Sequence, residues 1–286
     1  MLNSPLQYSE NAKFNCGGFI AAEEEIDVLL KTKVYDITEL IIIKELYKYK
    51  YLSINDIKKL LSIKLKPKLQ KPKYTGNINK LIRYGHIKKA EYIVEEERGI
   101  TVYFLTNAAY EFCRRKYINK PVTYEGIIDT SDISEILTRT SLNQFHIDTL
   151  VTKASVITKE TYYGRRKMGV RKAKFRSCIE IQSQEGKYCI VPVVYGKTGR
   201  INDVVSEIEA IDQVMSQCTE KIYPIIICSS IQEIKEAFER IDACVETPSQ
   251  TTFALERDCA IGNVLSKLFL VEREGPNITY LRCEIV

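Results

Sequence analysis

The chain of 286 residues lacks the cysteine and histidine spacings of a metal-binding protein. Its nine cysteines form no C-x-x-C pair, and His86 and His146 are its only histidines. A structural zinc site would need ligands scattered along the chain, so we expect no metal and no cofactor. Cys189 and Cys228 lie inside apolar runs, which is typical of buried thiols in a reducing compartment.

Long apolar runs are also absent. No stretch approaches the roughly 18 apolar residues that a membrane-spanning helix needs, and the first residues show no secretory leader pattern. We therefore expect a cytoplasmic protein that does not contact a membrane. A chain of this length, 45% hydrophobic, is expected to form two domains with cores of their own.

The most informative absence is that of acidic residues, since no Asp or Glu occurs between Ile57 and Ala90. This acid-free run carries eleven Lys and Arg residues, and apolar residues are interspersed at spacings that predict a folded core. A second acid-free run, from Thr161 to Ile179, carries seven cations, whereas the rest of the chain is net acidic. Basicity confined to two segments indicates a docking surface for a polyanion, and duplex DNA is the expected partner.

Two helices are predicted at the start of the first basic segment. Asp36 and Glu39 have the spacing of a capping box, and an apolar stripe continues from there to about Lys50. Ser53 and Asp56 mark the start of a second helix, which is expected to end before the proline at position 67. The lysine-rich segment 64–73 is expected to be a loop.

A third helix, capped by Thr75 and ended by Gly85, is predicted after this loop. Two strands follow over residues 87–94 and 100–105, joined by a turn, and a fourth helix covers residues 107–117. Three helices, a hairpin and a closing helix predict a winged helix-turn-helix of α+β class.

The segment Tyr103–Ala109, a strand that runs into Leu-Thr-x-x-Ala and a helix, is similar to the end of many bacterial winged-helix domains. In the order of its elements, most of the chain resembles the replication-relaxation proteins of plasmids and integrative elements. The resemblance rests on short motifs. It implies a C-terminal domain with a restriction-endonuclease-like fold, and a role in mobile-element replication, transfer or transcriptional control.

Four segments are expected: a polar arm at 1–33, the winged helix at 34–118, a linker at 119–133 and an α/β domain at 134–286. The apolar run 222–228 is typical of a buried parallel strand. In the α/β domain we expect helices at 134–156, 202–217 and 231–241, and strands at 175–181, 187–195, 222–228, 251–255, 268–271 and 278–285. His146 is expected on the first of these helices as a solvated or partner-facing residue.

The third helix of the winged domain would lie in the major groove of DNA. Asn77, Lys80 and Arg83 would contact base edges, whereas lysines would contact phosphates and Arg98, at the hairpin turn, would enter the minor groove. The full expected interface is Lys73, Tyr74, Thr75, Asn77, Lys80, Arg83, Lys88, Lys89 and Arg98. Two alternatives stay open: a merely solvated lysine-rich face, and a winged helix that docks a protein.

The second basic run interleaves cations with aromatic residues. Its cations are Arg165, Arg166, Lys167, Arg171, Lys172, Lys174 and Arg176. They form either a second DNA contact or a mobile, solubilising loop. The C-terminal domain would accordingly grip flanking DNA, form a homodimer, or receive another mobile-element protein.

A nuclease site of the implied fold would need one acid on a strand and an acid-x-Lys on the next, so that two carboxylates hold Mg²⁺. Glu180 and Lys197 offer two of these groups, but Tyr195 stands where the second acid is needed. Gly196-Lys197-Thr198 resembles a phosphate-binding loop, yet Val191 occupies the position of its first glycine. We therefore expect no catalytic residues and no enzyme activity. The alternative is a Mg²⁺-dependent endonuclease that uses Glu180 and Lys197.

Overall fold

The computed structural model describes part of the chain. It covers residues 13–17, 35–65, 74–94, 97–116, 133–153, 157–168, 171–183, 186–195, 205–206, 208–209, 211–212, 221–244 and 251–285. These residues form a mixed α+β structure with two sheets. The chain divides into two compact units inside helix α6 (Ile133–Lys153), between Asn143 and Gln144, which are called the N-terminal and C-terminal units here.

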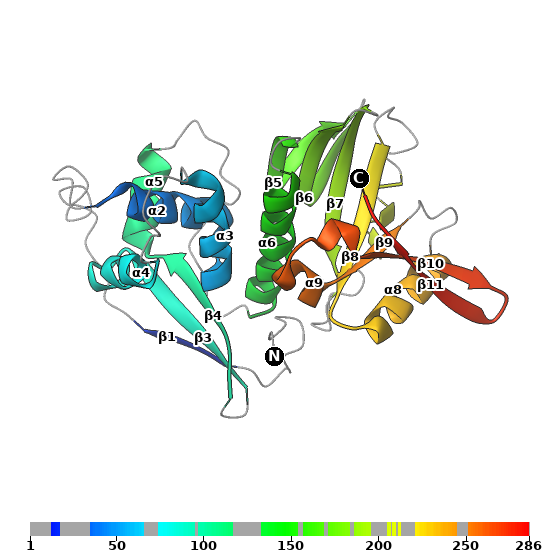
Figure 1. Ribbon diagram of the computed structural model, residues 1–286, viewed down its shortest axis with the longest axis horizontal. Helices are drawn as coiled ribbons and strands as arrows, with labels where there is room; N and C mark the ends of the chain where they lie inside the picture. Colours follow the sequence, from blue (N-terminus) through cyan, green and yellow to red (C-terminus); the bar gives the residue numbers. More distant parts are fainter. Residues whose placement is uncertain are drawn as a thin grey trace. The chain divides into compact units, whose positions relative to one another are not determined.

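The N-terminal unit combines a four-stranded sheet with helices (Figure 1). Its elements are β1 (Lys13–Gly17), α2 (Ile37–Tyr49), β2 (Leu52–Ser53), α3 (Ile54–Lys64), α4 (Tyr74–Arg83), β3 (Ile87–Val94), β4 (Glu97–Leu105) and α5 (Asn107–Lys116). The sheet has the order β1-β3-β4-β2, with antiparallel pairs throughout. The buried apolar residues expected from the helical periodicity, such as Leu46, Leu60 and Leu81, form its core.

The capping box predicted for α2 is confirmed, and the predicted start of α3 at Ser53 also has one. At α2 the Asp36 carboxylate accepts from the backbone of Thr38 and Glu39, while Glu39 accepts from the backbone N–H of Asp36 at 2.9 Å. At α3 the same exchange joins Ser53 and Asp56. Each box satisfies backbone N–H groups that the first helical turn leaves without partners, which fixes where the helix begins.

Helix α2 ends at a tight reversal centred on Lys50. This residue has φ 69° and ψ −57°, and the N–H of Tyr51 donates to the carbonyl of Tyr49 at 2.8 Å, which defines a γ-turn. The Asn143 amide donates to both carbonyls that flank the turn, those of Tyr49 at 3.0 Å and Tyr51 at 2.5 Å. A side chain distant in sequence thus holds the corner between α2 and β2.

The hairpin differs from its prediction in where the second strand begins. Strand β4 starts at Glu97, and Val94 pairs with Glu97, so that residues 95–96 alone stand between the strands. The expectation that Arg98 lies at the turn is therefore wrong, because Arg98 is a strand residue paired with Ile93. Helix α4 also begins one residue before Thr75, so Thr75 is helical and is not the cap that we expected.

The C-terminal unit is built on a seven-stranded mixed sheet of order β11-β10-β9-β8-β7-β6-β5. Its strands are β5 (Ile157–Met168), β6 (Arg171–Ser183), β7 (Gly186–Val194), β8 (Lys221–Cys228), β9 (Thr252–Leu255), β10 (Leu268–Glu274) and β11 (Asn277–Cys283). Strand β8 runs parallel to β7 and β9, as its continuous apolar sequence predicted. The remaining pairs are antiparallel.

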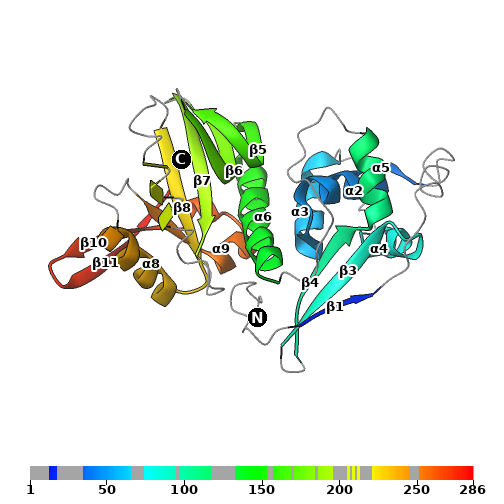
Figure 2. The same cartoon turned by 180° about the vertical axis from the view of Figure 1, so that it is seen from behind.

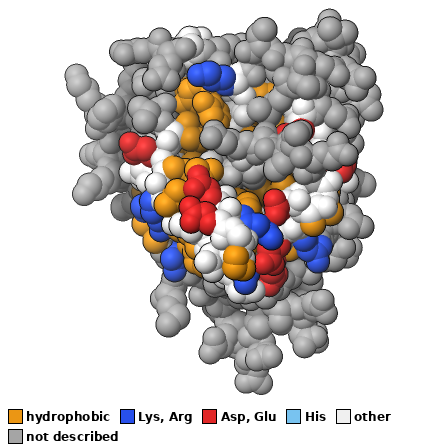
Figure 3. Space-filling view, turned by 90° about the vertical axis from the view of Figure 1, so that its right-hand side faces the viewer, with side chains coloured by type: hydrophobic (Ala, Val, Ile, Leu, Met, Phe, Trp, Pro, Cys, Tyr) orange, Lys and Arg blue, Asp and Glu red, His pale blue; other side chains and the backbone are white. Residues whose placement is uncertain are grey.

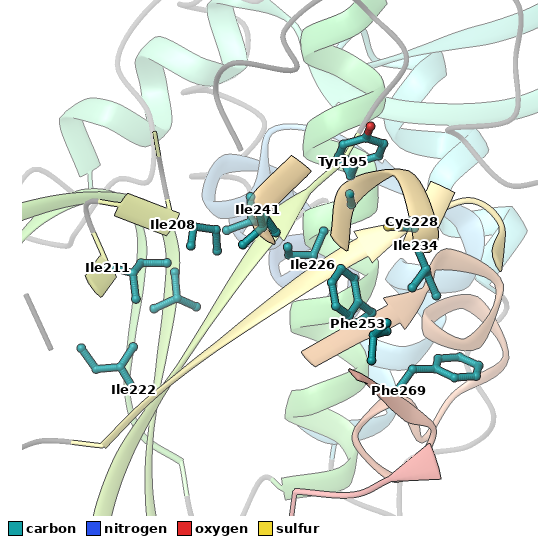
Figure 4. Packing of buried hydrophobic residues seen from close by; sticks show 14 of the residues in the cluster. Tyr195, Ile208, Ile211, Ile222, Ile226, Cys228, Ile234, Ile241, Phe253 and Phe269 are labelled. Carbon is teal, nitrogen blue, oxygen red and sulfur yellow. The ribbon is translucent and has the colours of Figure 1, made fainter. Parts of the chain in front are cut away.

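Helix α8 (Ile231–Cys244) covers one face of this sheet, as Figure 2 shows from behind. Figure 4 shows how Ile234 and Ile241 of α8 lie over Ile226 and Phe253 of the central strands. The short α9 (Glu256–Ile261) and the 3₁₀ helix η2 (Val264–Ser266) follow β9. The expected helix over 202–217 is described only at 205–206, 208–209 and 211–212, where the chain is helical and Ile208 and Ile211 are buried.

Helix α6 is buried along most of its length although many of its residues are polar. The hydroxyls of Thr140, Ser141 and Thr149 donate to the carbonyl four residues earlier, which satisfies them inside the helix. His146 is fully buried, so the expectation of a solvated histidine is wrong. Because intrahelical bonds satisfy these hydroxyls, the helix can be buried although its polar sequence is typical of an exposed helix.

Three strands, β1, β2 and β5, were not predicted. Strand β1 pairs with β3, and β5 pairs with β6 over most of the second basic run. The expected polar arm is described only at residues 13–17, and the expected linker only at its last residue. No helix among the described residues is long and apolar enough to span a membrane.

Candidate nucleic-acid interface

Helix α4 presents one polar face and one apolar face. Ile78 and Leu81 are fully buried, whereas Thr75, Asn79 and Arg83 are exposed at a spacing of four residues. Residues four apart lie above one another on a helix, so these three side chains form a single stripe. The expected base contact Asn77 is only half exposed and lies nearly opposite this stripe, about 160° around the helix from Asn79, and Tyr74 is also half exposed.

Sequence periodicity did not single out Asn79. The expected outward face was Asn77, Lys80, Arg83 and Tyr84, which is displaced around the helix from the observed stripe. The signal that could have found Asn79 was its spacing from Thr75 and Arg83, combined with the opposite position of Ile78 and Leu81.

Gly85 ends α4 as predicted, with a φ of 72° in the left-handed region. The N–H of His86 donates to the carbonyl of Leu81 at 3.0 Å, and the N–H of Gly85 donates to that of Ile82 at 2.9 Å. These two bonds define a Schellman motif, in which glycine avoids the steric conflict of a Cβ atom. The motif turns the chain directly from α4 into β3.

Lys80 does not extend freely from α4, because its ammonium is engaged by α2 and by the residue before the cap of α2. The Lys80 Nζ lies 3.0 Å from Glu39 Oε2 and 5.3 Å from the centre of the Tyr35 ring. Only 3% of the Glu39 side chain is exposed, against 34% for Lys80. The same carboxylate oxygen accepts from the backbone of Asp36, so Glu39 joins the cap of α2 to α4.

A second lysine of the acid-free run has a similar partner on the same helix. Lys64 Nζ lies 2.9 Å from Glu45 Oε1, an ion pair without hydrogen-bond geometry, and Glu45 is buried. Lys89, on β3, pairs with Glu91 at 2.9 Å on the exposed surface. The run that is free of acid in sequence is therefore partly neutralised in space, chiefly by two buried glutamates of α2.

The hairpin carries two lysines near its base and Arg98 near its far end. Lys88 is half exposed and Lys89 is exposed, and both follow the end of α4 closely in sequence. The far end of the hairpin contains Glu97, preceded by two further glutamates in sequence. Negative charge there opposes contact with phosphate, which leaves the base of the hairpin as the part suited to DNA. Lys73 lies outside the described residues.

His86 is fully buried directly behind α4. Its Nε2 and the Tyr35 hydroxyl are in hydrogen-bond contact, and the Tyr35 ring meets it edge-on with ring centres 5.2 Å apart. Burial lowers the pKa of His86 to about 4 and raises that of Tyr35 above its usual value. The imidazole is therefore neutral at physiological pH, so His86 places no charge behind α4.

We expect acid to destabilise the N-terminal unit through His86. The unfolded chain binds a proton on His86 below about pH 6.5, but the folded chain does so only below about 4, so stability is lost as the pH falls through this window. The free energy of unfolding should decrease by about 2 kcal/mol between pH 7 and pH 4.5 from this residue. Urea unfolding at both pH values, compared with His86→Gln, isolates this contribution.

The variant comparison is needed because Asp56 acts in the opposite direction. Burial raises the pKa of Asp56 despite two hydrogen bonds from Ser53, so its ionised form is disfavoured in the folded chain. Acid relieves that penalty. An acid effect of equal size in His86→Gln and in the wild-type protein would show that His86 does not cause it.

The second basic run lies on two paired strands and not in a loop. Arg165 pairs with Lys174, Lys167 with Lys172, and Met168 with Arg171 across the β5–β6 hairpin. Arg166 and Arg176 belong to the same two strands. The structure thus brings these cations together along one hairpin of the C-terminal unit.

The two groups proposed for a nuclease site are not both described. Glu180 is buried on β6, where it is paired in register with Lys159 and Cys189, whereas Lys197 lies outside the described residues. Among the residues that the structure covers, no three Asp, Glu, His or Cys side chains are grouped to hold a metal ion. The described residues therefore provide no group of ligands for the Mg²⁺ ion that the endonuclease alternative needs.

The opposite end of the C-terminal unit has mixed charge. Figure 3 views the molecule from the right-hand side of Figure 1, and over the described residues it shows cationic, anionic and hydrophobic side chains interspersed. Arg273 pairs with Asp242 at 3.1 Å, and Lys235 lies 3.9 Å from Glu239. The second pair provides an exposed cation, Lys235, that serves below as a control.

Comparisons with known proteins do not assign the chain to a family. No protein-family model matches the chain, and no curated protein matches it significantly.

Proposed function

We propose that the N-terminal unit is a winged helix-turn-helix that binds duplex DNA, with α4 as its recognition helix. The observation that carries the proposal is the exposed face of α4, which is polar, contains Arg83 and has no acid. Helix α2 packs against both α3 and α4, and β3 and β4 would form the hairpin of the wing. This order of elements is that of winged-helix proteins.

Cations at both ends of α4 suit phosphate contacts. Lys88 and Lys89 follow its C-terminal end, and the lysines of 66–73 precede it in sequence. Phosphate contacts fix the position of a recognition helix, and side chains at base edges supply specificity. The cations of the β5–β6 hairpin would add a further contact to flanking DNA.

The proposal extends to the C-terminal unit in a coarser form. A mixed sheet with parallel central strands and a helix over one face supports an α/β domain of restriction-endonuclease-like type. We propose that it has no active site and serves DNA binding, a second copy of the chain or another mobile-element protein. The corresponding biological role is replication, transfer or transcriptional control of a mobile element.

Binding to a labelled duplex of random sequence at low salt tests the proposal. Arg83→Ala combined with Lys89→Ala should weaken binding at least about tenfold, since two phosphate or base contacts are lost. Lys235→Ala is the matched control, because Lys235 is an exposed lysine on α8 and should leave affinity unchanged. No binding by the wild-type protein at low salt would contradict DNA recognition and favour a winged helix that docks a protein.

The same preparations separate binding from cleavage. We expect supercoiled plasmid to remain intact with the wild-type protein and Mg²⁺. Nicking that disappears in Glu180→Ala would replace the present proposal with a Mg²⁺-dependent endonuclease.

A further inference from the structure

We propose that Thr75, Asn79 and Arg83 read the bases of bound DNA, and that Lys80 is a positioning residue that does not touch DNA. This inference rests on the proposed function. It divides the polar residues of α4 into two sets, according to whether their side chains are exposed or held by α2.

The three reading residues share one stripe and have complementary chemistry. With roughly 3.6 residues per turn, side chains at i, i+4 and i+8 lie within about 80° of one another on the helix surface. Asn79 can bond the N6 and N7 atoms of adenine, and Arg83 can bond O6 and N7 of guanine. The methyl and hydroxyl groups of Thr75 suit contact with thymine or with a hydrogen-bonding base edge.

Lys80 lies to the side of this stripe and is committed to other partners. Its ammonium neutralises Glu39, a carboxylate that is 97% buried, and lies against the Tyr35 ring. Moving Lys80 to a phosphate would leave the buried carboxylate without its cation, which is strongly unfavourable. The pair therefore fixes the rotation of α4 relative to α2, and this rotation presents Asn79 and Arg83.

Further contacts join the two ends of this support. Tyr35 contacts Tyr84 edge-on with ring centres 6.0 Å apart, and its hydroxyl contacts His86. Tyr35 thus touches α4 through Lys80, the end of the helix through Tyr84, and the start of the wing through His86. These contacts belong to the folded unit itself and need no ligand.

Base preference is measured by selection of bound duplexes from a random library. Asn79→Ala should lose preference at one base position and bind the selected duplex about 5- to 150-fold more weakly, with little change on random DNA. Asn77→Ala is the matched control, since Asn77 is half exposed and lies nearly opposite the stripe, and it should keep the wild-type preference. An unchanged preference in Asn79→Ala would overturn the assignment of Asn79.

The role of Lys80 is read from the salt dependence of binding. Each cation that contacts a phosphate adds about 0.9 to the slope of log affinity against log salt. Glu39→Gln removes the countercharge and releases Lys80, so the slope should steepen by up to about 0.9. Adding Lys80→Met to this variant removes both charges, avoids an unpaired buried carboxylate, and should restore the wild-type slope.

The two ways of failing are distinguishable. If Lys80 contacts DNA in the wild-type protein, Glu39→Gln alone will not change the slope and the double variant will have a slope shallower by about 0.9. That result overturns the positioning role while DNA binding itself stands. If the wild-type protein binds no duplex at low salt, the proposed function fails and this inference fails with it.

Discussion

The affinity of the protein for duplex DNA is expected to fall about a thousandfold when salt is raised from about 50 to about 200 mM. The physical reason is the release of counterions from DNA when cations of the protein neutralise its phosphates. Some six phosphate contacts give a slope of about −5.4, and a fourfold rise in salt then weakens binding by about that factor. Lysines that lie in internal ion pairs do not contribute to it.

The structure makes this expectation specific to individual lysines. Lys89 forms an exposed ion pair with Glu91 on its own strand, in which water or phosphate can replace the carboxylate, so Lys89→Ala should make the slope shallower by about 0.9. Lys64 is held by the buried Glu45, so we expect Lys64→Ala to leave the slope unchanged. Anisotropy titrations at four salt concentrations measure both. An affinity independent of salt would contradict electrostatic recognition of DNA.

The sequence predicted those parts of the fold that depend on neighbouring residues. Asp36 with Glu39, and Ser53 with Asp56, define helix starts within one turn, and Gly85 defines a helix end by its backbone freedom. The run 222–228 predicted a buried parallel strand because both faces of such a strand are covered. In each case the determining interaction lies within a few residues or in the composition of one segment.

The features that the sequence did not predict depend on contacts between distant residues. No local pattern pairs Lys80 with Glu39, forty-one residues apart. The sequence therefore overstates the net positive charge around the acid-free run, because it does not show that Glu39 lies beside Lys80. The corner at Lys50 is held by Asn143, more than ninety residues away. Strand β5 was missed because its cations obscure the apolar alternation by which strands are recognised.

The sequence predicted which segment forms the candidate interface more accurately than it predicted which side chains of that segment are exposed. Charge and periodicity correctly indicated a helix with Arg83 exposed and Leu81 buried. They did not distinguish Asn77 from Asn79, because a displacement of two residues reverses the face of a helix and the start of α4 was uncertain by one residue. The location of Arg98 failed for a similar reason, since it depended on where β4 begins.

Replacing Lys80 should destabilise the N-terminal unit much more than replacing its partner. Lys80→Met leaves the Glu39 carboxylate, 3% exposed, without its cation, and we expect the free energy of unfolding to fall by about 3 kcal/mol. Glu39→Gln leaves an ammonium that is already 34% exposed and can be hydrated, so its cost should be about 1 kcal/mol. Urea unfolding monitored by circular dichroism measures both.

The double variant decides whether the carboxylate causes this asymmetry. Glu39→Gln combined with Lys80→Met contains no buried charge at this position, and it should be more stable than Lys80→Met alone. Glu39→Gln would then stabilise the Lys80→Met variant although it destabilises the wild-type protein. Loss of packing cannot explain such a reversal of sign. If the two costs simply add, Glu39 and Lys80 are not coupled, and the rotation of α4 must be fixed by packing of Ile78 and Leu81 against the core.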